Sequence, residues 1–233
     1  MSITRRELFA VAALGALGTS CRAGLPPSTA CASRPATPGV PPTHTDGQRL
    51  RLWSYNEMQQ ATPKVYRPKD SAALAAVLKG LQPGQRVTFR GGGQSLDEQP
   101  LNDDTVIALD GPGFVHIGEP QQDDSGYYLT TGAGARWWDI VCKIGKLGLF
   151  PPSLATAADA TVGGTLSADC VSRMSAVWGK EGEQIRSFKL MLVDGTELTL
   201  TRDDTEEDKR ALFEAVIGGF GYLGAVTEVT FDL

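Results

Sequence analysis

Between residues 62 and 110, the hydrophobic positions change from an alternating period to a helical one and back again. The apolar residues that share one helical face are Leu74, Val77, Leu78 and Leu81. Asp70 or Ser71 is placed to accept hydrogen bonds from the first free N–H groups of this helix, and Pro83-Gly84 ends it. The pattern predicts an α/β unit with strands at 64–66, 86–89 and 106–109 and a helix at 72–81.

The second half of the chain shows the same two periods in a different order. The predicted elements are strands at 127–131, 187–193, 197–201 and 225–231 and helices at 136–147 and 209–216. Asp194-Gly195 stands between two of these strands and is typical of a two-residue hairpin turn. We therefore predict an α+β domain in two lobes, at about 62–115 and 125–233, with no internal repeat.

The N-terminus has the features of an export signal. Residues 1–21 combine a basic start, a short apolar run and small residues, and the apolar run at 8–18 is too short to span a bilayer comfortably. The pair Arg5-Arg6 resembles a twin-arginine signal, which exports folded proteins, although an ordinary export signal fits too. Residues 22–46 are rich in Pro, Ala, Ser and Thr and predict a flexible linker. We expect a periplasmic or secreted protein whose folded part is 47–233.

The cysteines leave two questions open. Cys21 is a candidate for a lipid anchor, but Gly18 stands where a lipobox usually has Leu. Cys142 and Cys170 lie in the predicted folded part, and the sequence does not decide whether they pair or remain buried thiols. No cysteine or histidine spacing is typical of a metal site, so we expect none.

Composition excludes several classes of function. The chain has 233 residues, of which 41% are hydrophobic, and its formal net charge is −5. This is the composition of a globular protein and not of a disordered one. The mild acidity provides no basic surface for nucleic acid and no polybasic patch for anionic lipid.

The most informative segment is the run Phe89-Arg90-Gly91-Gly92-Gly93-Gln94-Ser95, which follows a predicted strand. Consecutive glycines permit backbone dihedral angles that a Cβ forbids, so that neighbouring N–H groups can point into one concavity and bind an anion. A phosphate or pyrophosphate would suit such a loop. A mobile loop would look the same in sequence, and the run matches neither the Walker loop nor the G-x-G-x-x-G fingerprint.

With its neighbours, this loop resembles the vanillyl-alcohol oxidase type, or PCMH type, of FAD-binding domain. The family's Arg-Gly-x-Gly-His-Ser loop is similar to Arg90–Ser95, and three further segments match in the same order. They are Pro68-Lys69-Asp70 before the first helix, Thr161–Ser167 as the second flavin loop, and Val216–Thr227 as the closing glycine-rich motif. From the residues alone, the second segment could be a tight turn and the third a close helix–sheet contact.

The resemblance implies a set of cofactor-binding residues and an oxidoreductase that transfers a hydride from an alcohol-type C–H to FAD. The implied residues are Arg90, Gly91, Gly92, Gly93, Gln94, Ser95, Pro151, Thr156, Thr161, Gly163, Gly164, Ser167 and Val226. Many relatives link FAD covalently through a His at the position of Gln94, and others through a Cys before the second loop. Gln cannot form that bond and residues 149–159 contain no Cys, so we expect non-covalent FAD.

Substrate and catalytic base are not implied. Residues 161–195 resemble the aldonolactone oxidase and decaprenylphosphoryl-ribose oxidase branch, but the histidines that often follow Asp169 are absent, so a sugar or lactone substrate is only suggested. Members of the family carry a second, substrate-binding (cap) domain after the flavin domain. We expect this chain to lack it, so that a partner chain or residues outside this sequence would complete an active enzyme. The alternative is a truncated or non-catalytic flavin-binding protein.

Overall fold

The first sheet contains the strand that leads into the glycine loop. The computed structural model describes residues 44–233, and four of its strands form this sheet in the order β1-β4-β6-β5. They are β1 (His44–Arg49), β4 (Lys64–Arg67), β6 (Thr105–Ala108) and β5 (Val87–Arg90). Strands β4, β6 and β5 run parallel, and β1 pairs antiparallel with β4. All four residues of β6 are buried, as expected for a central parallel strand.

The export features predicted from the sequence lie outside this part of the chain. The signal peptide 1–21, the candidate anchor Cys21 and all but the last three residues of the linker 22–46 are not among the described residues. Strand β1 begins at His44, within the last three linker residues. No helix within 44–233 combines the length and apolar character that crossing a membrane requires.

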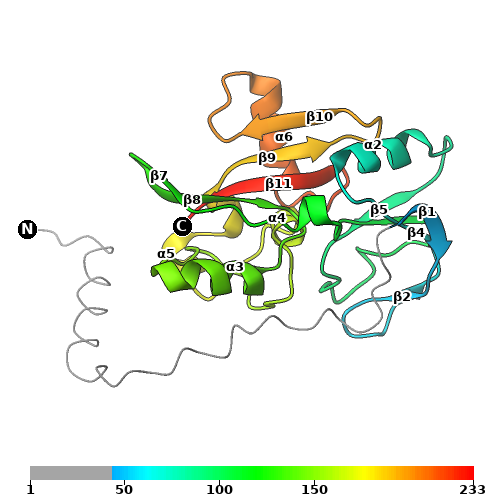
Figure 1. Ribbon diagram of the computed structural model, residues 1–233, viewed down its shortest axis with the longest axis horizontal. Helices are drawn as coiled ribbons and strands as arrows, with labels where there is room; N and C mark the ends of the chain where they lie inside the picture. Colours follow the sequence, from blue (N-terminus) through cyan, green and yellow to red (C-terminus); the bar gives the residue numbers. More distant parts are fainter. Residues whose placement is uncertain (1–43) are drawn as a thin grey trace, which may run out of the picture. The chain divides into compact units, whose positions relative to one another are not determined.

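Helix α2 (Ser71–Lys79) packs between the two sheets (Figure 1). Its buried residues contact both sheets, and the cluster consists of Leu74, Val77, Leu78, Ile107, Leu109, Phe114, Met191 and Ala225. Of the two predicted caps it is Asp70 that acts, because its carboxylate accepts a hydrogen bond from the N–H of Ala73 at 2.8 Å. The helix ends at Lys79, two residues earlier than predicted, and Leu81 still packs against the cluster.

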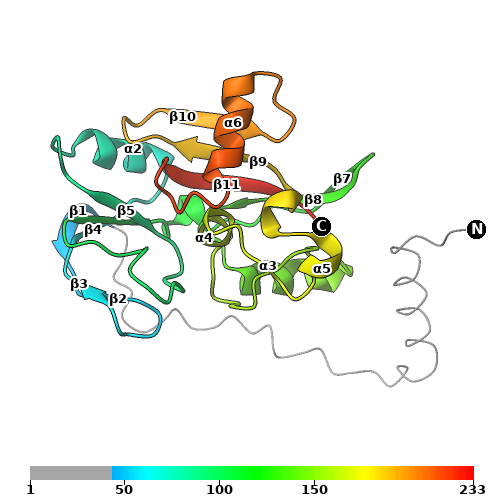
Figure 2. The same ribbon diagram turned by 180° about the vertical axis from the view of Figure 1, so that it is seen from behind.

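The second sheet is antiparallel throughout, in the order β10-β9-β11-β8-β7. Its strands are β7 (Gln121–Asp123), β8 (Gly126–Gly132), β9 (Ile185–Met191), β10 (Glu197–Thr201) and β11 (Ala225–Asp232). Helices α3 (Trp137–Ile144), α4 (Val162–Ser167) and α6 (Glu207–Val216) pack into one core with it, and Figure 2 shows α4 and α6 on the same side of β9 and β11.

Aromatic pairs fill the core between this sheet and its helices. The rings of Trp137 and Phe231 meet edge to face with centroids 5.2 Å apart, and those of Phe188 and Phe213 stack at 5.0 Å. All four side chains are buried. The helical spacing of Trp137, Ile140 and Ile144 therefore identifies the buried face of α3 correctly.

The turn at Asp194-Gly195 is not the two-residue turn that the dipeptide predicted. The N–H of Leu192 donates to the carbonyl oxygen of Thr196 and that of Gly195 to Leu192, so three residues, Val193 to Gly195, form the loop. Gly195 has φ +81°, which completes a type I turn with a glycine bulge. Asp-Gly suits both turns, and the register of β9 against β10 selects the longer one.

The α+β class and the two lobes are confirmed, and the elements that the sequence missed are short. They are β1, β7, the hairpin strands β2 (Leu52–Trp53) and β3 (Gln60–Ala61), helices α4 and α5 (Ser175–Trp178), and 3₁₀ turns at Pro112–Phe114 and Glu181–Gln184. The helix predicted at 136–147 forms as α3 and continues as a 3₁₀ turn at Gly145–Leu147. Elements of two to six residues show too few repeats of either period to be recognised. Only one of them, α4, belongs to the second glycine motif.

The cap of α2 leads to a stability prediction. Asp70→Ala removes the acceptor for the N–H of Ala73, so we expect the free energy of unfolding to fall by about 1 kcal/mol in urea titrations. Asp70→Ser keeps an acceptor and should lose less. Asp103→Ala, at an exposed loop position, is the matched control. An Asp70→Ala variant as stable as this control would show that the cap contributes nothing.

Candidate functional site

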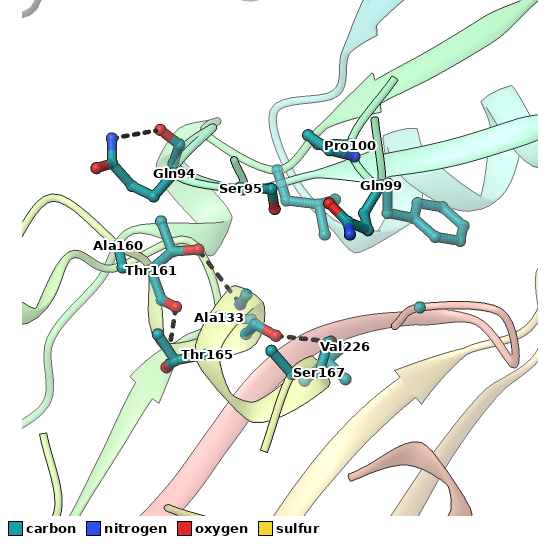
Figure 3. Close-up of a pocket in the computed structure, with 18 of the residues that line it drawn as sticks. Gln94, Ser95, Gln99, Pro100, Ala133, Ala160, Thr161, Thr165, Ser167 and Val226 are labelled. Atoms are coloured by element: carbon teal, nitrogen blue, oxygen red, sulfur yellow. Dashed lines mark hydrogen bonds between the residues drawn. The ribbon is translucent and has the colours of Figure 1, made fainter. Parts of the chain in front are cut away.

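A cavity of about 290 Å³ lies where the carboxyl ends of β5 and β6 face helix α4 and the start of β11. Parallel strands commonly bind ligands at this edge. Figure 3 shows Gln94, Ser95 and Gln99 on one side of it and Thr161, Ser167 and Val226 on the other. The lining residues come from three segments, within 89–100, 155–170 and 220–226, together with Leu109 and Ala133.

The glycine loop contributes free backbone donors to this cavity. Within residues 44–233, no N–H group from Gly91 to Ser95 donates a hydrogen bond to another protein group. These five residues are exposed or half-buried, so the donors remain accessible. Gly93 has φ +68°, in the left-handed region that glycine adopts without strain. The loop is therefore a set of unpaired amides suited to an anion.

Glycine is also required here because the loop touches the second glycine motif. A Cβ built on Gly91 would lie 2.3 Å from Oγ1 of Thr161, and one on Gly92 would lie 2.4 Å from the carbonyl oxygen of Asp159. The second contact is with backbone, which cannot swing away as a side chain can. Contact between residues 91–92 and 159–161 thus holds the two motifs against each other.

The second motif forms the N-cap and the whole of α4, and the amides of its first turn are already paired. Thr161 caps the helix by accepting from the N–H of Gly164, at 3.4 Å. The N–H groups of Val162 and Gly163 donate to the carbonyl oxygens of Ala135 and Ala133. A Cβ on Gly163 would lie 2.8 Å from that of Ala133. This motif therefore supplies close packing to the cavity wall, and the free donors come from the first loop.

Arg90 supports the glycine loop from outside the cavity. Its Nη2 donates to the carbonyl oxygen of Trp53 at 2.9 Å, and the N–H of Tyr55 donates to the carbonyl oxygen of Ser95 at 2.8 Å. Burial lowers the pKa of the Arg90 guanidinium, which stays charged at neutral pH all the same. The β2–β3 hairpin and Arg90 together brace the loop.

Ten of the thirteen residues predicted for cofactor binding line the cavity, and three do not. The ten are Gly91, Gly92, Gly93, Gln94, Ser95, Thr161, Gly163, Gly164, Ser167 and Val226. Arg90 is directed to Trp53, Pro151 is buried elsewhere, and Thr156 is exposed between the lining residues Ala155 and Ala157. Motif matching cannot separate residues whose side chains face a site from those that only flank it.

The cavity lining carries no formal charge. Among the described residues that form it there is no Lys, Arg, His, Asp or Glu, and its ionisable group is the Cys170 thiol. Burial raises the pKa of this thiol to about 11, and the charges of Glu181 and Asp169 add to the effect. Cys170 is free, which excludes a disulfide with Cys142. A protonated thiol is a weak nucleophile, so the lining offers binding groups rather than a reactive one.

A buried polar network behind α4 was not found from the sequence. The hydroxyl group of Thr165, a lining residue, accepts from Nε1 of Trp137 at 2.9 Å and lies 2.6 Å from Oε1 of Glu181. Glu181 is 2% exposed. Nothing in the sequence marks it, since it stands among other charged residues in a stretch with no periodic pattern.

Asp169, which follows the second glycine motif, has a structural role. Its carboxylate pairs with the ammonium group of Lys180 at 2.8 Å and accepts from the N–H of Gly182 at 3.1 Å. Its φ is +44°, so the chain reverses here after α4. The next residue, Cys170, lines the cavity. Asp169 itself binds Lys180 and Gly182 and so fixes the position of Glu181 between them.

The residues present fit an FAD cofactor. An elongated dinucleotide needs an anion-binding cradle for its pyrophosphate and an uncharged, closely packed wall for its rings. The amides of 91–95 supply the first and α4 with the start of β11 supplies the second.

Comparison with known proteins agrees with this geometry. Residues 62–201 match the family model described as an FAD binding domain. The chain is 35% identical over 179 residues to cytokinin dehydrogenase 8 of Oryza sativa subsp. indica, covering 71% of this chain and 32% of that protein. It is 28% identical over 188 residues to cytokinin dehydrogenase 1 of Arabidopsis thaliana, covering 76% and 31% of the two chains.

A third relative has a different name. A protein of Neurospora crassa described as a putative D-arabinono-1,4-lactone oxidase is 27% identical over 171 residues, covering 72% of this chain and 29% of its own. The chain thus spans about a third of the length of the curated relatives that it matches. From the cavity, its free amides and these matches together, we conclude that the chain belongs to the vanillyl-alcohol oxidase, or PCMH-type, family of FAD-binding oxidoreductase domains.

Proposed function

We propose that this chain binds FAD without a covalent bond and serves as the flavin half of an oxidoreductase that takes a hydride from an alcohol-type C–H. The observation that carries the proposal is the row of unpaired amides from Gly91 to Ser95 at the mouth of an uncharged cavity. Such donors bind a pyrophosphate without a positively charged side chain. When bound, FAD supplies the hydride acceptor.

The chain's own residues divide the work of holding the cofactor. The amides of Gly91–Ser95 hold the pyrophosphate, and the contact of Gly91 and Gly92 with residues 159–161 holds those amides in place. Thr161, Gly163, Gly164, Ser167 and Val226 line the flavin side. Neither side chain of Pro151 and Thr156 lines the cavity. These residues contribute only by directing the backbone towards α4.

Two side chains of the cavity, Gln94 and Cys170, support non-covalent binding. The amide of Gln94 turns back to the carbonyl oxygen of Gly92, at 3.3 Å. The cavity's thiol, Cys170, has a raised pKa and so little thiolate at neutral pH. Neither side chain offers the nucleophile that a covalent link to a flavin requires.

We propose that a further domain or a partner chain covers the open side of the cavity and supplies the substrate pocket and base. Apolar side chains next to the lining residues Cys170 and Phe220 are exposed, with Tyr222 at 90% and Val171 at 66%. Neighbouring exposed apolar residues on a globular protein are typical of a surface that another chain covers. The uncharged lining, which offers no base, supports the same proposal.

The names of relatives indicate candidate donors. An arabinono-lactone carries the alcohol-type C–H of the proposal, and a cytokinin would donate instead from a C–H next to an amine nitrogen. Arg5-Arg6 supports export of the folded, FAD-loaded protein to the periplasm or the exterior. An anchor at Cys21 has no support beyond the cysteine itself.

Acid precipitation tests the cofactor and its mode of binding. The purified full-length chain, after incubation with FAD and gel filtration, should show the visible flavin spectrum. Denaturation with acid should then release the flavin into the supernatant, because no covalent bond retains it. Flavin that stays in the pellet would contradict the inference that Gln94 leaves FAD without a covalent bond. Protein that never retains FAD would overturn the whole proposal.

Gly92→Ala tests the contact between the two glycine motifs. The new Cβ would meet the carbonyl oxygen of Asp159, so the loop must shift and its amides turn. We expect FAD affinity to fall about tenfold or more, ~1.4 kcal/mol, measured by quenching of flavin fluorescence. Gly145→Ala is the control, since a Cβ there meets nothing within 4 Å and the backbone is helical. Equal affinity in both variants would argue against this role.

Anaerobic reduction tests the reaction. The FAD-loaded chain should keep its visible band with either a cytokinin or an arabinono-lactone alone, because it lacks a base at the cavity. It should bleach slowly with dithionite, which needs no base. Rapid bleaching by either donor without any partner would show that the base lies within this chain.

A further inference from the structure

Glu181 is a buried carboxyl group that the binding of FAD leaves without a role. Its Oε1 lies 2.6 Å from Oγ1 of Thr165, on the wall of the cavity. Its Oε2 is buried and has no hydrogen-bond partner among the residues that the structure describes. An unpartnered carboxylate oxygen is costly to bury, so the position demands an explanation.

No positively charged group pairs with the carboxyl group of Glu181 among the residues that the structure describes. Lys180, its neighbour in the chain, directs its ammonium group to Asp169. Asp169 and Cys170 face the same carboxyl group, and neither provides positive charge. Burial raises the pKa of Glu181 to about 8; the hydrogen bond with Thr165 opposes the rise and the charge of Asp169 adds to it. Glu181 is thus mostly uncharged at neutral pH.

Thr165 can serve either protonation state of Glu181. If Glu181 is protonated it donates to Oγ1 of Thr165, whose own proton is then free for the carbonyl oxygen of Val162 at 3.1 Å. If Glu181 is ionised, Thr165 donates to it instead. Nε1 of Trp137 donates to Thr165 in both cases. The proton on Glu181 is therefore linked, through one hydroxyl group, to the first turn of α4.

We propose that reduction of the cofactor in the adjoining cavity drives Glu181, in the molecules where it is still ionised, to bind a proton from solvent, which offsets the negative charge that reduction brings. This inference rests on the proposed function. A hydride adds two electrons and one proton, so the oxidised cofactor gains one negative charge. The carboxylate of Glu181 gains an O–H bond, and an acid dissolved in the solvent, such as hydronium or a buffer acid, loses the proton. Across a low-dielectric wall, a new negative charge favours the neutral form of a nearby carboxyl group.

The redox potential of the FAD-loaded chain tests this role. Its midpoint potential should fall more steeply with pH in a window beginning near pH 8, where reduction draws an extra proton. Glu181→Gln keeps a buried polar side chain but cannot take up the proton, and the steep segment should disappear. Glu183→Gln, exposed two residues further on, should retain it. The same pH dependence in all three proteins would overturn the proposal.

An infrared measurement covers the case in which Glu181→Gln fails to fold or to hold FAD. Above about pH 8, reduction of the wild-type protein should produce a protonated-carboxyl band that moves when glutamate is labelled with ¹³C. Absence of this band would overturn the role of Glu181 while FAD binding stands. A wild-type chain that binds no FAD would overturn the proposed function as well, so the two failures are distinguishable.

The chain without cofactor provides an independent check of Glu181. Because its pKa is raised from 4.5 to about 8 on folding, the stability contributed by its neutral form is present below pH 4.5 and is lost as pH rises towards 8. The free energy of unfolding of the wild type should therefore fall relative to Glu181→Gln across this window. Urea titrations at several pH values measure it, and a constant difference would contradict a neutral, buried Glu181.

Discussion

The contact between the glycine loop and the chain before α4 is the constraint on which the cavity depends. Residues 91–92 pass so close to residues 159–161 that any Cβ would collide with a backbone carbonyl or a hydroxyl group. This contact brings an edge of the parallel sheet against the antiparallel lobe. It also turns the loop so that its amides stay unpaired, which backbone donors do only at a surface or at a binding site.

The hydrogen-bond donors of the cavity come from the first glycine loop, and its closely packed wall comes from the second glycine motif. This division explains why the lining needs no charged side chain. The first loop offers unpaired N–H groups. The N–H groups at the start of α4 donate hydrogen bonds within the fold, so α4 contributes only small side chains to the lining. A fixed cradle of dipoles binds an anion without the conformational entropy that long, positively charged side chains lose. With no formal charge at its surface, the cavity is sensitive to charges just behind it, and the carboxyl group of Glu181 contacts its wall through Thr165.

Sequence periodicity predicted the larger elements of both lobes to within three residues, because each has a buried face several repeats long. Prediction from the sequence failed where the same residues are compatible with more than one conformation. Asp194-Gly195 suits two hairpin turns, and the register of the flanking strands chose between them. Arg90 belongs to the glycine motif in sequence, but its side chain leaves the cavity to brace the loop on Trp53.

By itself, the sequence predicted the two lobes, the glycine loop as a candidate anion cradle and, by resemblance, the cofactor. These follow from local rules, since periodicity and the absence of Cβ atoms act over a few neighbouring residues. Only the tertiary structure decided which amides are free, that Cys170 reaches the cavity and that Glu181 lies buried behind Thr165. Burial and hydrogen-bond pairing depend on residues distant in sequence, and no local pattern encodes them.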